Sequence, residues 1–319
     1  MENWRKYEET ILEKLKPLFS SWTFEYDKKI IGKLSGRSRQ VDIFLSKTIN
    51  NKTYQIAIDC KFYSKRINIK HVESFIGMMK DLNTNQGILI TNVGYTKSAE
   101  IRVFNDEVNL ELDIYNFALL KDVQTDVIAK FYPHLQYSLT VLPPFGFVVD
   151  QRKGSPFPYI CFFVLRGLSV EEAMHDRNEM LDISLFPKMP QLKNAGMFKQ
   201  IDIDDCKTRY DSLLITDFQF EHNSATLNTG YRIELSDTII YKLLIEFDKV
   251  ILAFNLYCNK IWESKNLRKL LYIVNTFVFE PITQIELKNL EGFYGKLDPR
   301  ASYNMMLTFE NDDPATNNI

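Results

Sequence analysis

The chain reads SRQVDIFLSKTINNKTYQIAIDCKF from Ser38 to Phe62. Apolar runs at 41–45 and 54–62, separated by a turn-forming stretch at 49–52, predict two strands joined as a hairpin. Alternate side chains of a strand share a face, so Asp59 and Lys61 are predicted to be neighbours with Cα atoms about 7 Å apart. Pairing within the hairpin would then bring Asp42 beside Asp59.

Two adjacent carboxylates repel each other unless a cation lies between them. Magnesium prefers oxygen ligands and often binds through one or two carboxylates plus substrate phosphate. We therefore expect Asp42 and Asp59 to hold Mg²⁺, for which Mn²⁺ can substitute. Lys61 would orient the attacking water and offset charge in the transition state. Glu8, in a predicted helix at 2–20, would add a third carboxylate or accept a proton, a role for which Glu9 and Glu13 compete.

The segment around these acids is basic. Residues 28–70 contain 11 Lys and Arg and only two acids, Asp42 and Asp59. Such a segment suits a polyanionic partner such as nucleic acid, although a solvated basic face is an equally ordinary explanation. Five basic residues flank the predicted centre and are candidates for phosphate contacts: Arg37, Arg39, Lys65, Arg66 and Lys70.

The order of predicted elements indicates an α/β fold for residues 1–120. A helix at 69–82, a strand at 87–91, a helix at 96–105 and a strand at 110–117 follow the hairpin, which predicts a mixed sheet flanked by helices. The character changes at about 121. We expect residues 121–319 to form a second, α+β domain with a helix at 262–276 and strands at 137–149, 158–166, 212–220, 226–235, 238–247 and 250–258. The acidic run at 202–205 is predicted to be a solvated loop, and 311–319 a loose tail.

Other classes of protein are disfavoured. The four cysteines and four histidines are scattered, which argues against a zinc site, a disulfide framework or a histidine-centred nuclease. No apolar run is long enough to cross a bilayer, and the N-terminus lacks the apolar stretch of a signal peptide. These features predict a cytoplasmic protein without membrane contact.

A D-x-K triplet is common by chance, and only its ordered context makes it informative. That context resembles the PD-(D/E)XK nuclease superfamily, in particular its Mrr-like restriction-endonuclease branch. Tyr7-Glu8-Glu9-Thr10-Ile11 resembles the family's first helix, Gln40-Val41-Asp42-Ile43 its second motif and Ile58-Asp59-Cys60-Lys61 its third. The strand at 87–91 and the following Thr96 and Ala99 resemble the elements that close its core. Ala57 replaces the family's proline, at a position that is often relaxed.

The resemblance implies an endonuclease that hydrolyses phosphodiester bonds, with DNA as its expected substrate and defence against foreign DNA as its role. It also suggests a homodimer, which allows both strands to be cut. Two alternatives stay open: a module that binds nucleic acid without cutting, and a nuclease for DNA or RNA that a ligand or partner activates at residues 121–319. That second domain carries no recognisable motif, and we expect target recognition, sensing or dimerisation from it.

Overall fold

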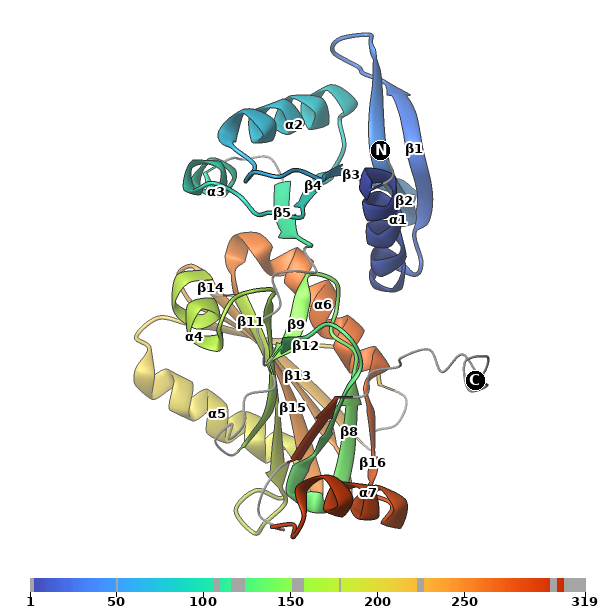
Figure 1. Ribbon diagram of the computed structural model, residues 1–319. Helices are drawn as coiled ribbons and strands as arrows, with labels where there is room; N and C mark the ends of the chain where they lie inside the picture. Colours follow the sequence, from blue (N-terminus) through green and yellow to red (C-terminus); the bar gives the residue numbers. More distant parts are fainter. Residues whose placement is uncertain are drawn as a thin grey trace, which may run out of the picture. The chain divides into compact units, whose positions relative to one another are not determined.

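A computed structural model describes residues 3–49, 51–105, 110–115, 124–150, 158–177, 179–222, 227–298 and 303–306. The chain forms two compact units, Met1–Leu120 and Lys121–Ile319 (Figure 1). None of the helices in these described segments is long and apolar enough to cross a membrane.

The N-terminal unit is built on a five-stranded sheet in which the strands follow their order in the chain. Its members are β1 (Thr23–Ile31), β2 (Ser38–Ile49), β3 (Lys52–Lys61), β4 (Gln86–Thr91) and β5 (Leu110–Ile114). β1, β2 and β3 pair antiparallel, whereas β4 and β5 join in parallel. The predicted hairpin and the predicted mixed sheet are both confirmed.

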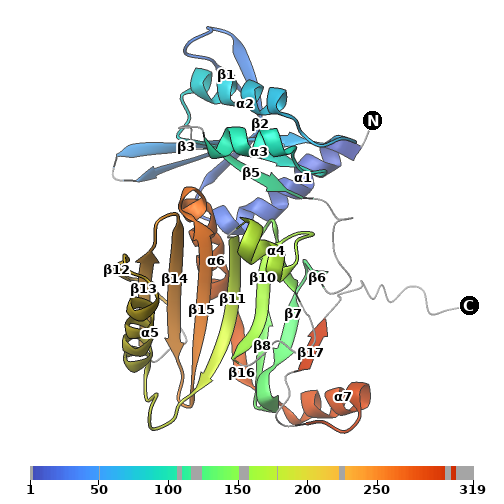
Figure 2. The ribbon, with the colours of Figure 1, turned by 90° about the vertical axis from the view of Figure 1, so that its left-hand side faces the viewer.

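The helices of this unit are α1 (Asn3–Leu15), the 3-10 helix η1 (Lys16–Phe19), α2 (Ile69–Leu82) and α3 (Lys97–Phe104). Local chemistry sets the ends of α2, because the Asn68 side chain accepts a hydrogen bond from the Lys70 amide and Asn83 adopts the left-handed conformation that ends a helix. Thr96 caps α3 through the Ala99 amide. α2 and α3 lie side by side over the parallel strands (Figures 1 and 2).

The C-terminal unit contains an eight-stranded and a four-stranded sheet. The larger sheet has, in spatial order, β12 (Leu214–Phe218), β13 (Leu227–Glu234), β14 (Thr238–Glu246), β15 (Val250–Asn259), β11 (Glu179–Pro187), β10 (Tyr159–Leu165), β9 (Phe147–Asp150) and β6 (Gln124–Thr125). The smaller has β16 (Val278–Pro281), β8 (Tyr137–Val141), β7 (Ala129–Tyr132) and β17 (Tyr303–Met306). All described pairings in this unit are antiparallel.

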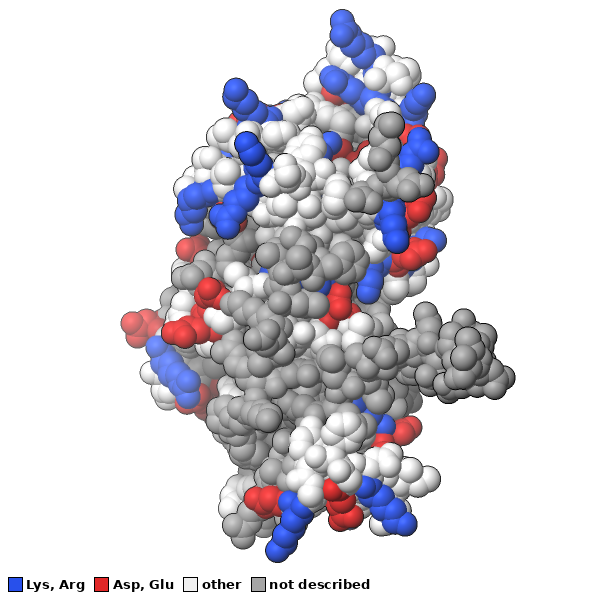
Figure 3. Space-filling model, in the orientation of Figure 1, with Lys and Arg blue, Asp and Glu red and all other residues white. Residues whose placement is uncertain are grey.

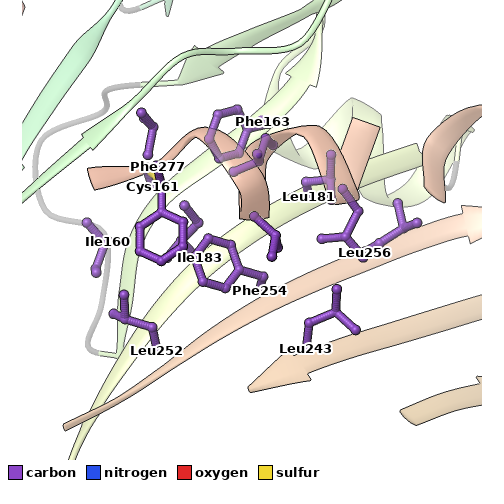
Figure 4. Packing of buried hydrophobic residues seen from close by; sticks show 14 of the residues in the cluster. Ile160, Cys161, Phe163, Leu181, Ile183, Leu243, Leu252, Phe254, Leu256 and Phe277 are labelled. Carbon is purple, nitrogen blue, oxygen red and sulfur yellow. The ribbon is translucent and has the colours of Figure 1, made fainter. Parts of the chain in front are cut away.

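The helices of the C-terminal unit are α4 (Val170–Glu172), the π-helix η4 (Ala173–Arg177), α5 (Ala195–Arg209), α6 (Glu263–Thr276) and α7 (Gln284–Tyr294), with short 3-10 turns η3 (Pro133–Leu135) and η5 (Lys260–Trp262). α5 and α6 lie on opposite sides of the large sheet (Figure 1). On the α6 side, Phe254 and Phe277 pack with ring centroids 4.8 Å apart within a large buried apolar cluster (Figure 4).

Two expectations for the C-terminal unit need correction. The acidic run at 202–205 lies within α5 and is not a loop, and the segment predicted at 137–149 divides into β8 and β9 around Pro143 and Pro144. The predicted tail at 311–319 and the last residues of the predicted strand at 110–117 lie outside the described residues. The predicted strands from 212 to 258 and the helix at 262–276 are confirmed to within two residues at each end.

Candidate active site

Asp42 and Asp59 are held together where β2 and β3 run side by side. The Cys60 amide donates a hydrogen bond of 2.7 Å to Asp42 Oδ2, which ties the Asp42 side chain to the neighbouring strand. Asp59 is 8% exposed. Burial, together with the adjacent Asp59 carboxylate, raises the pKa of Asp42 to about 7. The structure therefore concentrates two carboxylates where a cation would relieve their repulsion.

Lys61 extends this pair into a triad. Its amine lies 2.7 Å from Asp59 Oδ2, as the alternation of β3 predicted. Burial opposes the charge on the amine, but the Asp59 carboxylate outweighs it and raises the pKa of Lys61 above its ordinary value. Lys61 is therefore a protonated donor at neutral pH. In that state it can stabilise negative charge but cannot accept a proton.

Glu8 projects from α1 toward the same centre. It is 8% exposed, whereas Glu9 and Glu13 are exposed to solvent, so the fold brings only Glu8 to the triad. Burial raises the pKa of Glu8, the charge of Asp59 adds to this rise, and Lys61 opposes it. All four predicted residues, Glu8, Asp42, Asp59 and Lys61, thus meet in one region of the N-terminal unit.

Tyr26 is a residue of this region that the sequence did not reveal. Its hydroxyl, on β1, donates a hydrogen bond of 2.7 Å to Glu8 Oε2. The next residue, Asp27, has φ +50°, in the left-handed region. The pairs Tyr26–Ile43 and Lys28–Val41 flank it, so this irregularity lies opposite Asp42. No motif in the sequence singles out Tyr26.

The basic candidates divide into two groups. Arg37, Lys65, Arg66 and Lys70 are exposed, and Lys and Arg side chains are numerous over the N-terminal unit in Figure 3. Arg39 differs, because its Nε lies 2.6 Å from Asp81 Oδ2. Its guanidinium is therefore already engaged by a carboxylate of the same unit.

The donor chemistry fits a hard divalent cation. Asp42 and Asp59 offer only oxygen ligands, which magnesium prefers, and two carboxylates suffice when water and phosphate supply the rest. Among the described residues, no group of three or more His, Cys, Asp or Glu side chains is arranged to hold a metal ion. The neighbouring Cys60 is no soft ligand or nucleophile, because burial raises the pKa of its thiol well above the ordinary value.

The N-terminal unit is similar to catalytic domains of the restriction-endonuclease type. Residues 14–117 match the Mrr catalytic family, whose description is restriction endonuclease. This range includes Asp42, Asp59 and Lys61 and begins after Glu8, and it confirms the resemblance seen in the motifs. No curated protein sequence matches the chain.

Solved structures with detectable similarity are remote in sequence. The protein of unknown function AF1548 is 13% identical, with a TM-score of 0.30, over 36% of this chain and 60% of that one. The DNA modification-dependent restriction endonuclease AspBHI is 18% identical, with a TM-score of 0.26, over 35% of this chain and 28% of that one. The Ran-binding protein Mog1p of Saccharomyces cerevisiae is 16% identical, with a TM-score of 0.30, over 44% of this chain and 89% of that one. The chain thus spans less than two thirds of the first two proteins.

Proposed function

We propose that this protein is a magnesium-dependent endonuclease that hydrolyses phosphodiester bonds of DNA. The observation that carries the proposal is the triad itself: Asp42 and Asp59 adjoin each other, and the Lys61 amine lies 2.7 Å from Asp59 Oδ2. Its position inside the segment that matches a restriction-endonuclease family supports the same reading.

In this proposal Asp42 and Asp59 hold Mg²⁺, with Mn²⁺ as a substitute. When bound, the ion supplies Lewis-acid polarisation of the phosphate and lowers the pKa of water. The hydrogen bond from the Cys60 amide fixes one oxygen of Asp42 and leaves the other for a ligand. This anchoring reduces the reorganisation that cation binding would otherwise require.

Lys61 and Glu8 stabilise charge and transfer a proton during hydrolysis. Water attacks phosphorus, one P–O ester bond breaks, and the departing oxygen takes up a proton from solvent. Lys61 donates to the phosphoryl oxygen on which negative charge accumulates. Glu8, oriented by the Tyr26 hydroxyl, accepts the proton that the attacking water loses, because its raised pKa makes it a better base than an ordinary carboxylate.

The direct test is a cleavage assay with supercoiled plasmid, linear duplex, single-stranded DNA and RNA. Wild-type protein is compared with Lys61→Ala and Asp59→Ala in magnesium, in manganese and with chelator. Metal-dependent cutting of DNA that both substitutions abolish supports the proposal. Cutting that survives both substitutions would refute the site, and binding without cutting by the wild type would favour a non-cleaving module.

The role of the second unit is part of the same proposal. We assign residues 121–319 to target recognition, sensing of a regulatory ligand or partner, or dimerisation, since the nuclease residues all lie in the first unit. We further propose that the protein acts in the cytoplasm as a homodimer and that it defends the cell against foreign DNA. Sedimentation of the full chain with and without duplex DNA would test the dimer.

A further inference from the structure

The turn between β1 and β2 is fastened by a single buried carboxylate. Asp81, near the end of α2, is 3% exposed. Its Oδ1 accepts hydrogen bonds from the amides of Leu34 at 2.9 Å and Ser35 at 2.8 Å, and its Oδ2 accepts from the Ser35 hydroxyl and Arg39 Nε, both at 2.6 Å. The Lys33 amide adds a bond of 2.7 Å to the Asp81 backbone oxygen. The turn is therefore fixed before any ligand arrives.

The backbone of the turn is adapted to this arrangement. A Cβ at Gly32 would lie 2.3 Å from Asp81 Oδ2, so no larger residue fits without moving the carboxylate. Gly36 has φ +65°, the left-handed conformation that favours glycine. Both positions thus specify one shape of the turn. The bonds from Ser35, with that from Arg39, hold the pKa of Asp81 well below its ordinary range.

This fixed turn presents an apolar tip between positive charges. Leu34 is 79% exposed and Ile31 is 65% exposed. Lys33 and Arg37 are exposed on either side, and residues 28–41 contain five Lys and Arg and no acid. One exposed leucine needs no explanation. Leu34 is a different case, because it lies on a basic turn that four hydrogen bonds to the buried Asp81 carboxylate hold in one conformation. Ordering a turn in this way costs conformational entropy, which suggests that the fixed shape has a use.

The turn lies within reach of a duplex bound at the active site. β2 leads from Ser38 at the turn to Asp42, which at about 3.3 Å per residue is about 13 Å of strand. The tip lies a few residues further, within about 20 Å, or roughly six base pairs at 3.4 Å per step. The turn projects from the N-terminal unit beyond the neighbouring strands (Figures 1 and 2).

We propose that the turn at 32–37 is a preformed contact for duplex DNA. Lys33 and Arg37 hold phosphates on either side of a groove, and Leu34 enters the groove as an apolar wedge against a base step. Arg39 is a positioning residue in this arrangement, because its guanidinium secures Asp81. The inference rests on the proposed function and names the part of the duplex-binding surface that lies away from the reacting phosphate.

The test measures binding of a fluorescent duplex by the full chain carrying Lys61→Ala, which separates binding from cutting. Adding Lys33→Ala and Arg37→Ala should raise Kd about tenfold or more and reduce the slope of log K against log salt by about 2. Adding Leu34→Ala should raise Kd several-fold without changing that slope. Leu34→Ala should also remove the fluorescence rise of 2-aminopurine placed in the contacted base step. Ile101→Ala, at a 49% exposed position of α3 in the same unit, is the matched control.

Three outcomes would overturn this proposal, and two of them would leave the proposed function standing. If the wild type cuts duplex DNA but all turn variants bind it like the Lys61→Ala parent, the turn is not a DNA contact and the nuclease assignment stands. If the wild type neither binds nor cuts DNA, the proposed function fails and the turn proposal fails with it. Equal loss of binding to single-stranded DNA would also refute the wedge, because a single strand has no groove. Thermal melting of each variant excludes misfolding.

Discussion

The amine of Lys61 lies 2.7 Å from Oδ2 of Asp59, and both side chains leave the same face of β3. Substituting Lys61 by Ala should lower the rate of DNA cleavage by about 10²- to 10³-fold, the usual effect of removing one transition-state donor. Duplex binding should change only a few-fold. Single-turnover cleavage and fluorescence anisotropy measure the two effects, with Lys97→Ala as an exposed basic control. A Lys61→Ala protein that cuts at the wild-type rate would contradict the role assigned to the amine.

Asp42 offers a test of metal binding that does not depend on activity. Its pKa is raised to about 7, so its ionised form is destabilising in the folded protein without metal. The stabilisation that a proton gives is present at acid pH and is lost as pH rises through about 7. At pH 8 without metal, Asp42→Asn should therefore raise the Tm of the N-terminal unit by several degrees. This gain should shrink below pH 5, where the wild-type carboxyl is protonated.

Magnesium should reduce or reverse the difference in Tm between Asp42→Asn and the wild type. Added Mg²⁺ should raise the Tm of the wild type at pH 8 in a concentration-dependent manner and leave that of Asp42→Asn nearly unchanged. Asn can still accept the hydrogen bond from the Cys60 amide, so the comparison isolates the charge. Differential scanning calorimetry gives both values. Equal stabilisation of the two proteins by Mg²⁺ would show that the ion binds elsewhere.

Tyr26 should act through Glu8. The Tyr26 hydroxyl lowers the pKa of Glu8 against the opposing effect of burial, so Tyr26→Phe should raise that pKa further. The acid limb of the pH–rate profile should move to higher pH, and kcat at neutral pH should fall several-fold. Glu8→Gln should remove the limb altogether. An unchanged profile in Tyr26→Phe, with Tyr54→Phe as control, would mean that the hydrogen bond has no part in proton transfer.

Asp182 predicts the pH response of the second unit. It is 1% exposed, and its Oδ1 accepts hydrogen bonds from Asn255 Nδ2 at 2.7 Å and Ser184 Oγ at 2.9 Å. No residue in the described part of the chain is hydrogen-bonded to its Oδ2. Burial raises the pKa of Asp182 to about 6. This pKa lies above the value in the unfolded chain, about 3.9. The contribution of the protonated Asp182 carboxyl to stability is therefore present at acid pH and is lost as pH rises through about 6.

Asp182→Asn keeps the accepting oxygen and removes the charge. Above pH 7 it should raise the free energy of unfolding of the second unit by up to about 3 kcal/mol, and near pH 4 it should have little effect. Urea unfolding at several pH values, followed by tryptophan fluorescence, provides the measurement. A variant that is less stable than wild type at pH 8 would contradict the buried charge as the source of the penalty.

The sequence predicted those parts of the fold and site that short-range patterns determine. The period of β3 placed Asp59 beside Lys61, and the turn at 49–52 paired β2 with β3. The choice of Glu8 over Glu9 and Glu13 needed the packing of α1, since all three lie on one short helix. α5 was misread because its run from Asp202 to Asp205 is polar, although Asp202 accepts a hydrogen bond from Tyr231 and pairs with Lys242.

Hydrogen-bond partners that lie far apart in the sequence could not be predicted from it. Tyr26 meets Glu8 across 18 residues, and Asp81 meets Leu34 and Ser35 across more than 40. Neither contact follows from a local period or motif, because each depends on how a helix is placed against the sheet. Arg39 illustrates the consequence: its position in a basic segment predicted a phosphate contact, and the fold pairs it with Asp81.

The central claim is that Asp42, Asp59 and Lys61 form a metal-dependent nuclease centre. The most direct measurement is the rate of nicking and linearisation of supercoiled plasmid as Mg²⁺ is titrated, for the wild type and for Asp59→Ala purified in parallel. The account predicts a rate that saturates with Mg²⁺ for the wild type, falls to background with chelator and stays at background for Asp59→Ala at every concentration. Cutting by Asp59→Ala at the wild-type rate, or wild-type cutting that persists in chelator, would contradict it.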